Sequence, residues 1–578
     1  MVRPPTIPDT GARLPRRFHL GTGHGAAFVA TNGAAAGRKP ATNGAGNTME
    51  QFDYIVVGAG SAGAALAARL SENPKNSVLL VEAGRASHVY SWLPVSFGLL
   101  IHNPAANWLY ESEPEECTGN RAIPVPRGKL VGGSSAINGL VWVRGQPLDY
   151  NTWAQMGARG WSWQDVAPVF TKIENYEGGT ANGRGDEGPL KVSVVPDQNP
   201  LYDALFKAGE QAGFKINPDY NSEDQEGICK TQTSIHKGVR MSVARCYLKP
   251  AMKRPNLRVI SDAPTRRIVL EGKRCVGIVY ERFGKEIEVR AGREVILSAG
   301  AVATPQLLEL SGIGRPEILK QHGIEVKHAL PAVGENLRDH INARIIWRVK
   351  VPEVSYNTRA RGFGAVKEAV RYATTRGGFL SLPSAPLLAF LKTQKEMETP
   401  DVQMHIVPYS VKDPKKRILQ EFPSMTISVY QLRPESLGSI HIRSADPDAQ
   451  PKILFNFLTD VRDQRAMIDG FNIIRKIADQ PALKTYRGDE YSPGLGVRTD
   501  DEILHYIRNN SQTAYHPIGT CRMGPAGPNT VVDERLRVHG ISGLRIADAS
   551  IFPTMPSGNT NAPSIMVGEK AAEILKAA

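Results

Sequence analysis

The segment from Phe52 to Gly84, "FDYIVVGAGSAGAALAARLSENPKNSVLLVEAG", constrains the fold of this chain more than any other. A β-branched run at residues 54–57 leads into the glycine pattern GxGxxG, and a helix-like stretch of small residues follows. A second apolar run, residues 78–81, then ends at Glu82. This order predicts a strand, a tight turn, a helix and a second, parallel strand, which is the βαβ unit that binds dinucleotides.

Each glycine of this turn has its own expected role. Gly58 allows the tight turn, Gly60 lets the backbone approach a pyrophosphate, and Gly63 lets the helix pack closely on the strand. The carboxylate of Glu82 is placed to accept hydrogen bonds from both hydroxyls of an adenosine ribose, and it would repel a 2′-phosphate, which argues against NADP. FAD and NAD both fit this unit. Its other expected contacts to the dinucleotide come from Ser61, Ala62 and Ala83.

The composition describes a globular protein with more than one domain. The chain has 578 residues, of which 41% are hydrophobic and 22% are charged, and single cores rarely grow beyond roughly 300 residues. We therefore expect two domains that share a long interface. No apolar stretch approaches the roughly 18 residues that a membrane span needs, so no transmembrane segment is predicted. The formal net charge is +13, but the Lys and Arg residues are scattered without a nucleic-acid-binding signature, so no nucleic-acid partner is expected.

Residues 1–49 are predicted to be a disordered N-terminal extension, because they are rich in Gly, Ala, Thr and Pro and have no apolar periodicity. Arg16-Arg17 gives this segment a faint likeness to an export signal or a transit peptide, and a translation start at Met49 fits at least as well. The cysteines are odd in number and widely spaced, at Cys117, Cys229, Cys246, Cys275 and Cys521. They form no disulfide framework, which favours a reducing, cytoplasmic location.

Four further segments follow the glycine-rich turn in order. They are "RGKLVGGSSAINGLVWVRG" at 127–145, "SAGAVATPQLLELSGIG" at 298–314, "AYHPIGTC" at 514–521 and "GLRIADASIFPTMPSGNTNAPSIMVGEKAA" at 543–572. Together with that turn, they resemble the glucose-methanol-choline (GMC) family of FAD oxidoreductases, and within it the choline-dehydrogenase-like branch. The resemblance covers Met49 to Ala578.

The resemblance implies an α/β fold in which an FAD-binding, Rossmann-like doubly wound domain is interleaved with an α+β substrate domain built on an antiparallel sheet. We expect residues 50–322 to form mainly the FAD-binding domain, with insertions from the substrate domain. Residues 323–498 should form mainly the substrate-binding domain. Residues 499–578 should return to the FAD-binding domain and carry the catalytic residues.

FAD is too long for one βαβ unit, so other loops must cover its ribityl chain and isoalloxazine ring. Glycines in the second loop would let backbone amides approach the cofactor, and two strand ends would complete the site. The residues expected to bind FAD outside the first unit are Arg127, Gly132, Gly133, Ser134, Asn138, Gly139, Val141, Ala299, Gly300, Asp548, Ala549 and Asn559. Family members with covalently attached flavin carry a histidine where this chain has Val125, so FAD is expected to be noncovalent.

His516, in "AYHPIGTC", admits several interpretations. A metal ligand would need two or three partners at suitable spacing, and none is visible nearby. Cys521 shows no sign of activation as a nucleophile, and a structural histidine is the remaining alternative from the residues alone. The resemblance implies instead that His516 is the general base that takes the hydroxyl proton of a primary alcohol while the hydride goes to flavin N5. It also implies that Asn561 orients the alkoxide and that the product is an aldehyde.

The sequence leaves the alcohol open. Choline-specific members carry a glutamate at the position of Pro386, and a buried cation without a counter-charge is costly, which argues against choline. Choline dehydrogenase proper nevertheless remains an alternative. An apolar pocket for an aliphatic, terpenoid or aromatic alcohol, or else simple core packing, is suggested by Leu380, Leu382, Pro383, Leu387, Leu388 and Phe390.

Two other questions stay open in the sequence. Oxygen, a quinone or another electron acceptor would reoxidise the flavin, and the positive charge is compatible with peripheral membrane association. The alternative reaction class is a lyase on the same fold, of the hydroxynitrile lyase or fatty-acid photodecarboxylase type.

Overall fold

The computed structural model describes residues 41–42, 48–413 and 418–577. Most of the extension that is predicted to be disordered lies outside these residues. All five cysteines are free. Within the described ranges, no helix is long and apolar enough to cross a membrane.

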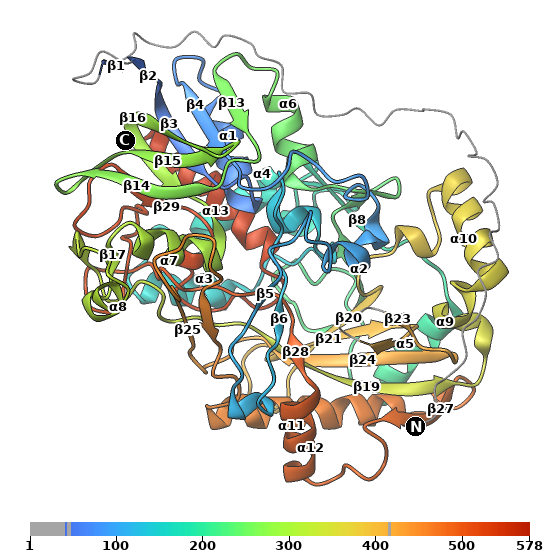
Figure 1. Ribbon diagram of the computed structural model, residues 1–578. Helices are drawn as coiled ribbons and strands as arrows, with labels where there is room; N and C mark the ends of the chain where they lie inside the picture. The colour runs from blue at the N-terminus through green and yellow to red at the C-terminus, as the bar shows by residue number, and fades with distance from the viewer. Residues whose placement is uncertain (1–40, 43–47, 414–417, 578) are drawn as a thin grey trace, which may run out of the picture. The chain divides into compact units, whose positions relative to one another are not determined.

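A mixed seven-stranded sheet carries the predicted βαβ unit (Figure 1). Its strands follow the order β13 (Leu257–Ile260), β4 (Val78–Val81), β3 (Gln51–Val57), β16 (Lys285–Leu297), β15 (Arg274–Arg282) and β14 (Thr265–Glu271), and β29 (Leu544–Ile546) also pairs with β16. The pairs from β13 to β16, together with β29, are parallel, whereas β14 and β15 pair antiparallel. Parallel strands that end at one edge place their following loops side by side, which is where a dinucleotide binds.

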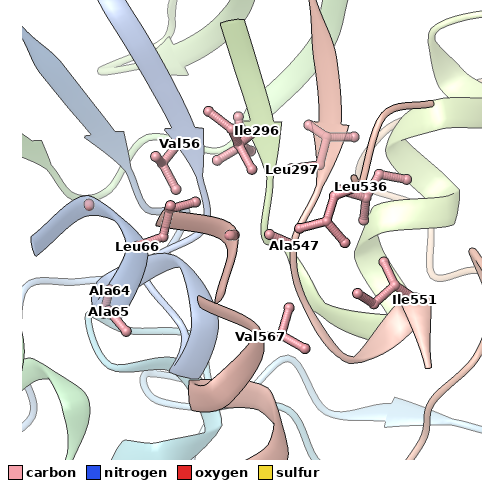
Figure 2. Close-up of a cluster of buried hydrophobic side chains, with 14 of the residues drawn as sticks. Val56, Ala64, Ala65, Leu66, Ile296, Leu297, Leu536, Ala547, Ile551 and Val567 are labelled. Atoms are coloured by element: carbon pink, nitrogen blue, oxygen red, sulfur yellow. The ribbon is translucent and has the colours of Figure 1, made fainter. Parts of the chain in front are cut away.

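Two helices from opposite ends of the sequence pack together beside this sheet. Helix α1 (Ser61–Leu70) follows the glycine turn, and α13 (Asn561–Lys576) lies directly against it. Small residues make this approach possible, since a Cβ on Gly568 would lie only 2.3 Å from the carbonyl oxygen of Ala62. Figure 2 shows the buried core that results, with Val56, Leu66 and Val567 among its members. The packing brings the C-terminal motif to the first glycine turn.

A second seven-stranded sheet is antiparallel throughout. Its strands follow the order β27 (Arg487–Ser492), β19 (Ile341–Val349), β24 (Ser424–Gln431), β21 (Val402–Val407), β20 (Leu387–Leu391) and β9 (Gly227–Lys230), and β28 (Gln512–Thr513) also pairs with β19. Helices α5 (Pro200–Gln211), α11 (Val461–Ala478) and α12 (Asp500–Asn510) share a hydrophobic core with one face of this sheet. The opposite face is free to form a site.

Along the central strands of this sheet, side chains alternate between the hydrophobic core and a cavity. In β21, Val402, Met404 and Ile406 belong to the core that includes the helices, whereas His405 points to the opposite face and lines a cavity. Strands β19 and β24 repeat the pattern, because successive side chains of a strand point to opposite faces. The residues of these three strands that line the cavity are Asn342, Arg344, His405, Val407, Thr426 and Ser428.

The chain passes between the two sheets more than once. Helix α5 and strand β9 interrupt the region predicted to be mainly FAD-binding, and α12 and β28 follow residue 498 but still belong to the second sheet and its helices. The predicted fold class, a doubly wound α/β unit interleaved with an antiparallel-sheet unit, is confirmed. The domain boundaries themselves stay a prediction. Helix α7 (Gly300–Leu310) follows β16 in the chain, and α10 (Gly362–Thr375) lies between β19 and β20.

Candidate active site

A cavity of about 940 Å³ is lined by both sheets. Its wall includes the first glycine turn, the second glycine-rich loop, the end of β16 and the polar face of the second sheet. The predicted residues that line it are Gly58, Gly60, Ser61, Ala62, Glu82, Ala83, Arg127, Gly133, Ser134, Asn138, Gly139, Val141, Ala299, Gly300, His516, Asp548, Ala549, Asn559 and Asn561. The cavity is at the upper end of the usual range for cofactor sites, about 300–1,000 Å³.

The first glycine turn fits a dinucleotide. No protein atom lies within 4 Å of the position that a Cβ on Gly60 would occupy, so this backbone is open for a close approach. Gly63 does not line the cavity, and its missing side chain serves packing, because a Cβ there would lie 2.0 Å from the carbonyl oxygen of Gly58. The carboxylate of Glu82 accepts backbone N–H bonds from Ala59 (2.9 Å) and Gly84 (2.8 Å), and burial raises its pKa to about 7.

The second glycine-rich loop lies directly on the first turn. The N–H of Gly132 donates to the carbonyl of Ala59 (2.8 Å), and a Cβ on Gly133 would lie 2.7 Å from the Cα of Gly60. Gly132 does not line the cavity, and it places the loop rather than contacting a ligand. The glycines are therefore needed where two backbone segments meet beside the cavity.

Asp548 ties the two strand ends together. Its Oδ2 accepts from the N–H of Gly300 (2.8 Å) and the hydroxyl of Thr304 (2.7 Å), and its Oδ1 accepts from the N–H of Ser550 (2.8 Å). Burial raises the pKa of this carboxyl. The residues that follow β16 and β29 thus form one polar corner of the cavity, whose lining also includes both glycine-rich loops, and these residues fit FAD.

The backbone around His516 is held by two charged side chains. The preceding residue, Tyr515, has a left-handed conformation with φ of 71°. Its carbonyl accepts from the guanidinium of Arg127 (2.5 Å), and the N–H of His516 donates to Asp339 Oδ1 (2.8 Å). The same oxygen of Asp339 accepts from the N–H of His340 (2.7 Å). Asp339 therefore fixes two histidines relative to each other.

A hydrogen-bond chain that starts at a backbone carbonyl sets the tautomer of His516. The carbonyl of Leu432 can only accept, so Nε2 of His340 carries the proton of their 2.9 Å bond. Because burial lowers the pKa of His340 to about 4, this ring is neutral and its Nδ1 is an acceptor. That Nδ1 lies 2.9 Å from Nδ1 of His516, which must therefore donate. Nε2 of His516 is left with a lone pair.

The same environment keeps His516 neutral. Its pKa is lowered well below the usual value, first by burial and then by His340, His405 and Arg127. Burial, followed by Arg344 and His340, also lowers the pKa of His405 to about 4. A neutral ring with an unprotonated Nε2 at the cavity wall is the form that a general base requires.

Asn559, not Asn561, is the amide beside the base. Nδ2 of Asn559 lies 3.0 Å from Nε2 of His516, and its Oδ1 accepts from Nε2 of Gln403 (3.3 Å). Asn561 begins α13, where its Oδ1 accepts from the hydroxyl of Ser61 in the glycine turn (2.8 Å). The sequence expectation that paired Asn561 with His516 is therefore wrong. The pairing changes because α13 starts at residue 561 and is bound to the glycine turn through Ser61, while the loop before it reaches His516.

The apolar pocket expected from residues 380–390 is also wrong. None of Leu380, Leu382, Pro383, Pro386, Leu387, Leu388 and Phe390 lines the cavity. Leu387, Leu388 and Phe390 lie in β20, and all three are fully buried in hydrophobic core. The alternative that these residues are simply core is the one that holds. The cavity wall on the second sheet is polar instead.

Sequence reasoning missed several residues around the base: Asp339, His340, Arg344, Gln403 and His405. For Arg344, Gln403 and His405 the signal was present as polar residues at alternate positions of otherwise apolar strands, as in "VQMHIV" at 402–407, whereas Asp339 and His340 precede β19 and carry no such signal. Cys521, by contrast, is buried, and burial raises its thiol pKa well above the usual value, so it is no activated nucleophile.

Comparisons with known proteins agree on one family. Family models described as GMC oxidoreductase match residues 52–342 and 434–568. The chain is 42% identical over 534 residues to a protein named oxygen-dependent choline dehydrogenase from Brucella suis biovar 1 (strain 1330), covering 90% of this chain and 95% of that one. A protein of the same name from Rhizobium etli (strain ATCC 51251 / DSM 11541 / JCM 21823 / NBRC 15573 / CFN 42) is also 42% identical, with the same coverage.

Solved structures give the same result. Pyridoxine 4-oxidase from Mesorbium loti superimposes with a TM-score of 0.82 at 28% identity, covering 91% of this chain and 99% of the other. A formate oxidase superimposes with a TM-score of 0.85 at 27% identity, covering 92% and 99%. Two glycine-rich loops and a neutral histidine surround one large cavity, and the comparisons agree with this arrangement. This chain belongs to the GMC oxidoreductase family and is an FAD-dependent alcohol oxidoreductase.

Proposed function

We propose that this protein oxidises a primary alcohol to the aldehyde with His516 as the general base and Asn559 as the group that orients the substrate oxygen. The 3.0 Å contact between Nε2 of His516 and the amide of Asn559 carries this proposal. An alcohol oxygen that replaces this direct contact and lies within hydrogen-bond reach of both groups would give its proton to Nε2 and accept a hydrogen bond from the amide. FAD, when bound, accepts the hydride from the alcohol carbon.

The protein can hold the proton after transfer. Nδ1 of His516 donates to His340 whether the His516 ring is neutral or protonated, so the contact at 2.9 Å survives the step. Burial opposes the protonated form, which favours passing the proton on when the aldehyde leaves. Asn561, bound to Ser61 in the glycine turn, supports the cofactor site instead of the substrate.

The polar face of the second sheet favours a substrate alcohol that carries no fixed positive charge. Among the described second-sheet residues that line the cavity, none is a carboxylate, and Arg344 and His405 lie at this wall. Desolvating a quaternary ammonium beside a guanidinium is costly. We therefore favour neutral or anionic primary alcohols over choline, and the names of the relatives make choline the rival to test.

Anaerobic mixing of the flavoprotein with a panel of alcohols tests the proposal. Bleaching of the oxidised flavin absorbance should be fastest with neutral primary alcohols or hydroxy acids and slow with choline. In His516→Ala and Asn559→Ala, bleaching should slow by about a hundredfold or more while bound flavin is retained. Asn561→Ala should lose flavin instead, with a near-normal rate per bound flavin.

Two outcomes would refute separate parts of this proposal. If Asn561→Ala slowed bleaching as much as Asn559→Ala at full flavin occupancy, the assignment of the orienting amide would be wrong. If choline bleached the flavin faster than every neutral alcohol, the substrate class would be wrong while the chemistry stood.

The same panel under air, with and without a dye acceptor, distinguishes oxygen from another electron acceptor of the reduced flavin. A cytoplasmic location stays a prediction.

A further inference from the structure

Helix α10 presents its apolar side chains to solvent and its polar ones to the protein. Of its 14 residues only Glu368 and Tyr372 are buried. Glu368 accepts hydrogen bonds from Arg359 (2.8 Å) and from the N–H of Phe379 (2.8 Å), and the hydroxyl of Tyr372 donates to the carbonyl of Gly238 (2.7 Å). A helix attached to its own protein by a carboxylate and a hydroxyl is the reverse of the usual amphipathic arrangement.

The outer face of α10 carries a continuous apolar stripe. Phe363, Val366 and Val370 are 84%, 56% and 57% exposed, and their spacing of three and four residues places them on one face. Residues 89–92 lie next to α10, since the ring of Trp92 lies 6.1 Å from that of the buried Tyr372, and Val89 and Tyr90 are exposed beside the helix. In Figure 1, α10 (yellow) lies at the right-hand edge of the ribbon.

Positive charge surrounds this stripe. Residues 359–376 contain five basic side chains and one acidic one, a net charge of 5 − 1 = +4, and the single acid, Glu368, is buried against Arg359. Lys367 and Arg371 are exposed on α10 itself, and the guanidinium of Arg376 lies 6.0 Å from the ring centroid of Trp92. Exposed aliphatic and aromatic residues flanked by Lys and Arg are typical of helices that lie in the plane of a membrane interface.

We propose that α10 and residues 89–92 form a docking surface for an anionic lipid bilayer. A second copy of this chain fits the surface poorly, since a symmetric contact would oppose +4 to +4. Lipid headgroups supply the complementary negative charge, and Trp92 and Tyr90 are residues that favour the boundary between headgroups and acyl chains. From this surface the chain continues to Phe97 and Ile101, which line the cavity, so docking holds one cavity wall close to the bilayer.

Co-sedimentation of the full-length flavoprotein with vesicles tests the docking surface. Binding to mixed phosphatidylcholine–phosphatidylglycerol vesicles is expected, with little binding to phosphatidylcholine alone and weaker binding in high salt. The triple variant F363S/V366S/V370S should bind about tenfold more weakly and keep its flavin spectrum. Phe283→Ser is the matched control, because Phe283 is 85% exposed at the distant hairpin between β15 and β16, and this variant should bind normally.

Three results would overturn the proposal. One is failure of the wild-type protein to bind the mixed vesicles at low salt. Another is equal binding by the triple variant and Phe283→Ser, which would show that charge alone attracts the protein. The third is a wild-type dimer in analytical ultracentrifugation that the triple variant loses, which would make this surface an interface between copies.

Discussion

At the scale of single residues, the proposed chemistry depends on which nitrogen of His516 keeps its lone pair. His340, which lies 176 positions earlier in the chain, sets the tautomer of His516 through a 2.9 Å contact between the two Nδ1 atoms. The tautomer of His340 is set in turn by the carbonyl of Leu432, which accepts the proton on Nε2 of His340. A positioning residue of this kind touches no substrate. Without it, the single proton of the neutral His516 ring is no longer held on Nδ1, and a ring that carries this proton on Nε2 cannot act as the proposed base.

Replacing His340 tests this role. His340→Asn keeps an acceptor near the position of Nδ1, whereas His340→Leu keeps none, so we expect kcat to fall at least about tenfold further in the leucine variant. Both variants remove one cause of the lowered pKa of His516, so the acid limb of the kcat/KM profile should move to higher pH. The measurement is a pH profile of flavin reduction at matched flavin content. Equal loss in both variants with an unmoved acid limb would reduce His340 to simple packing.

At the scale of elements, two glycines three residues apart in the first βαβ unit serve different needs. A Cβ at Gly60 meets no protein atom within 4 Å, whereas a Cβ at Gly63 would overlap the carbonyl of Gly58 at 2.0 Å. The helix therefore needs Gly63 in order to pack, and the cavity needs Gly60 in order to admit a cofactor. These are the separate roles that the GxGxxG pattern predicts for the two positions, and the space around each Cβ agrees with them.

Alanine at each position separates them. Gly60→Ala should leave the thermal unfolding midpoint of the FAD-free protein nearly unchanged but weaken FAD binding at least about tenfold, because its methyl group takes up ligand space. Gly63→Ala should lower the free energy of unfolding by about 1–3 kcal/mol through overpacking. Calorimetry of the FAD-free proteins and flavin titration measure the two effects. A destabilised Gly60→Ala protein would contradict the open space beside that residue.

A second element-scale feature joins β25 (Ser439–His441) to α7. Nδ1 of His441 lies 2.7 Å from Glu309, and its Nε2 lies 3.3 Å from Glu335. Burial lowers the pKa of His441, but the hydrogen bonds and charges of the two glutamates outweigh it and raise the value to about 9. Because the folded pKa lies above the unfolded one, the stabilisation is complete below pH 6.5 and is lost as the pH rises through 9.

This contact predicts a pH-dependent stability. A shift from 6.5 to about 9 corresponds to about 3 kcal/mol of unfolding free energy between those pH values. Denaturant unfolding of the wild-type protein and of His441→Gln at both ends of this window measures it. The variant should lose most of the difference between the two pH values. A variant with the wild-type pH slope would show that the ion pair contributes nothing.

At the scale of the whole molecule, the cavity joins the two sheets. Its wall takes residues from the glycine turns on one side and from β19, β21 and β24 on the other, so a cofactor that fills the cavity would contact both. A ligand that binds only the folded state stabilises it by RT ln(1 + [L]/Kd), about 4 kcal/mol at a thousandfold excess over Kd. FAD should therefore stabilise the protein as a unit.

Removal of FAD tests both this stabilisation and its noncovalent attachment. Val125, where some family members attach flavin, is fully buried in β6 (Pro124–Val125) and has no nucleophilic atom. Acid precipitation should leave all flavin in the supernatant, and the FAD-free protein should unfold several degrees lower than the FAD-loaded protein. A yellow pellet would mean attachment at another residue. An unchanged melting temperature would contradict the expected stabilisation of the folded protein by FAD.

The sequence by itself determined the βαβ unit, the family and the cofactor class, and it singled out His516 as a candidate, because each is marked by motifs of residues close together in the chain. The strand at 78–81 and the glycine roles could be predicted because local periodicity and turn geometry decide them. Only the tertiary structure decided that Asn559 and not Asn561 meets His516, and that a leucine-rich strand is core while the cavity wall is polar. Those outcomes depend on where a helix begins and which face of a strand turns inward, and packing between distant segments sets both.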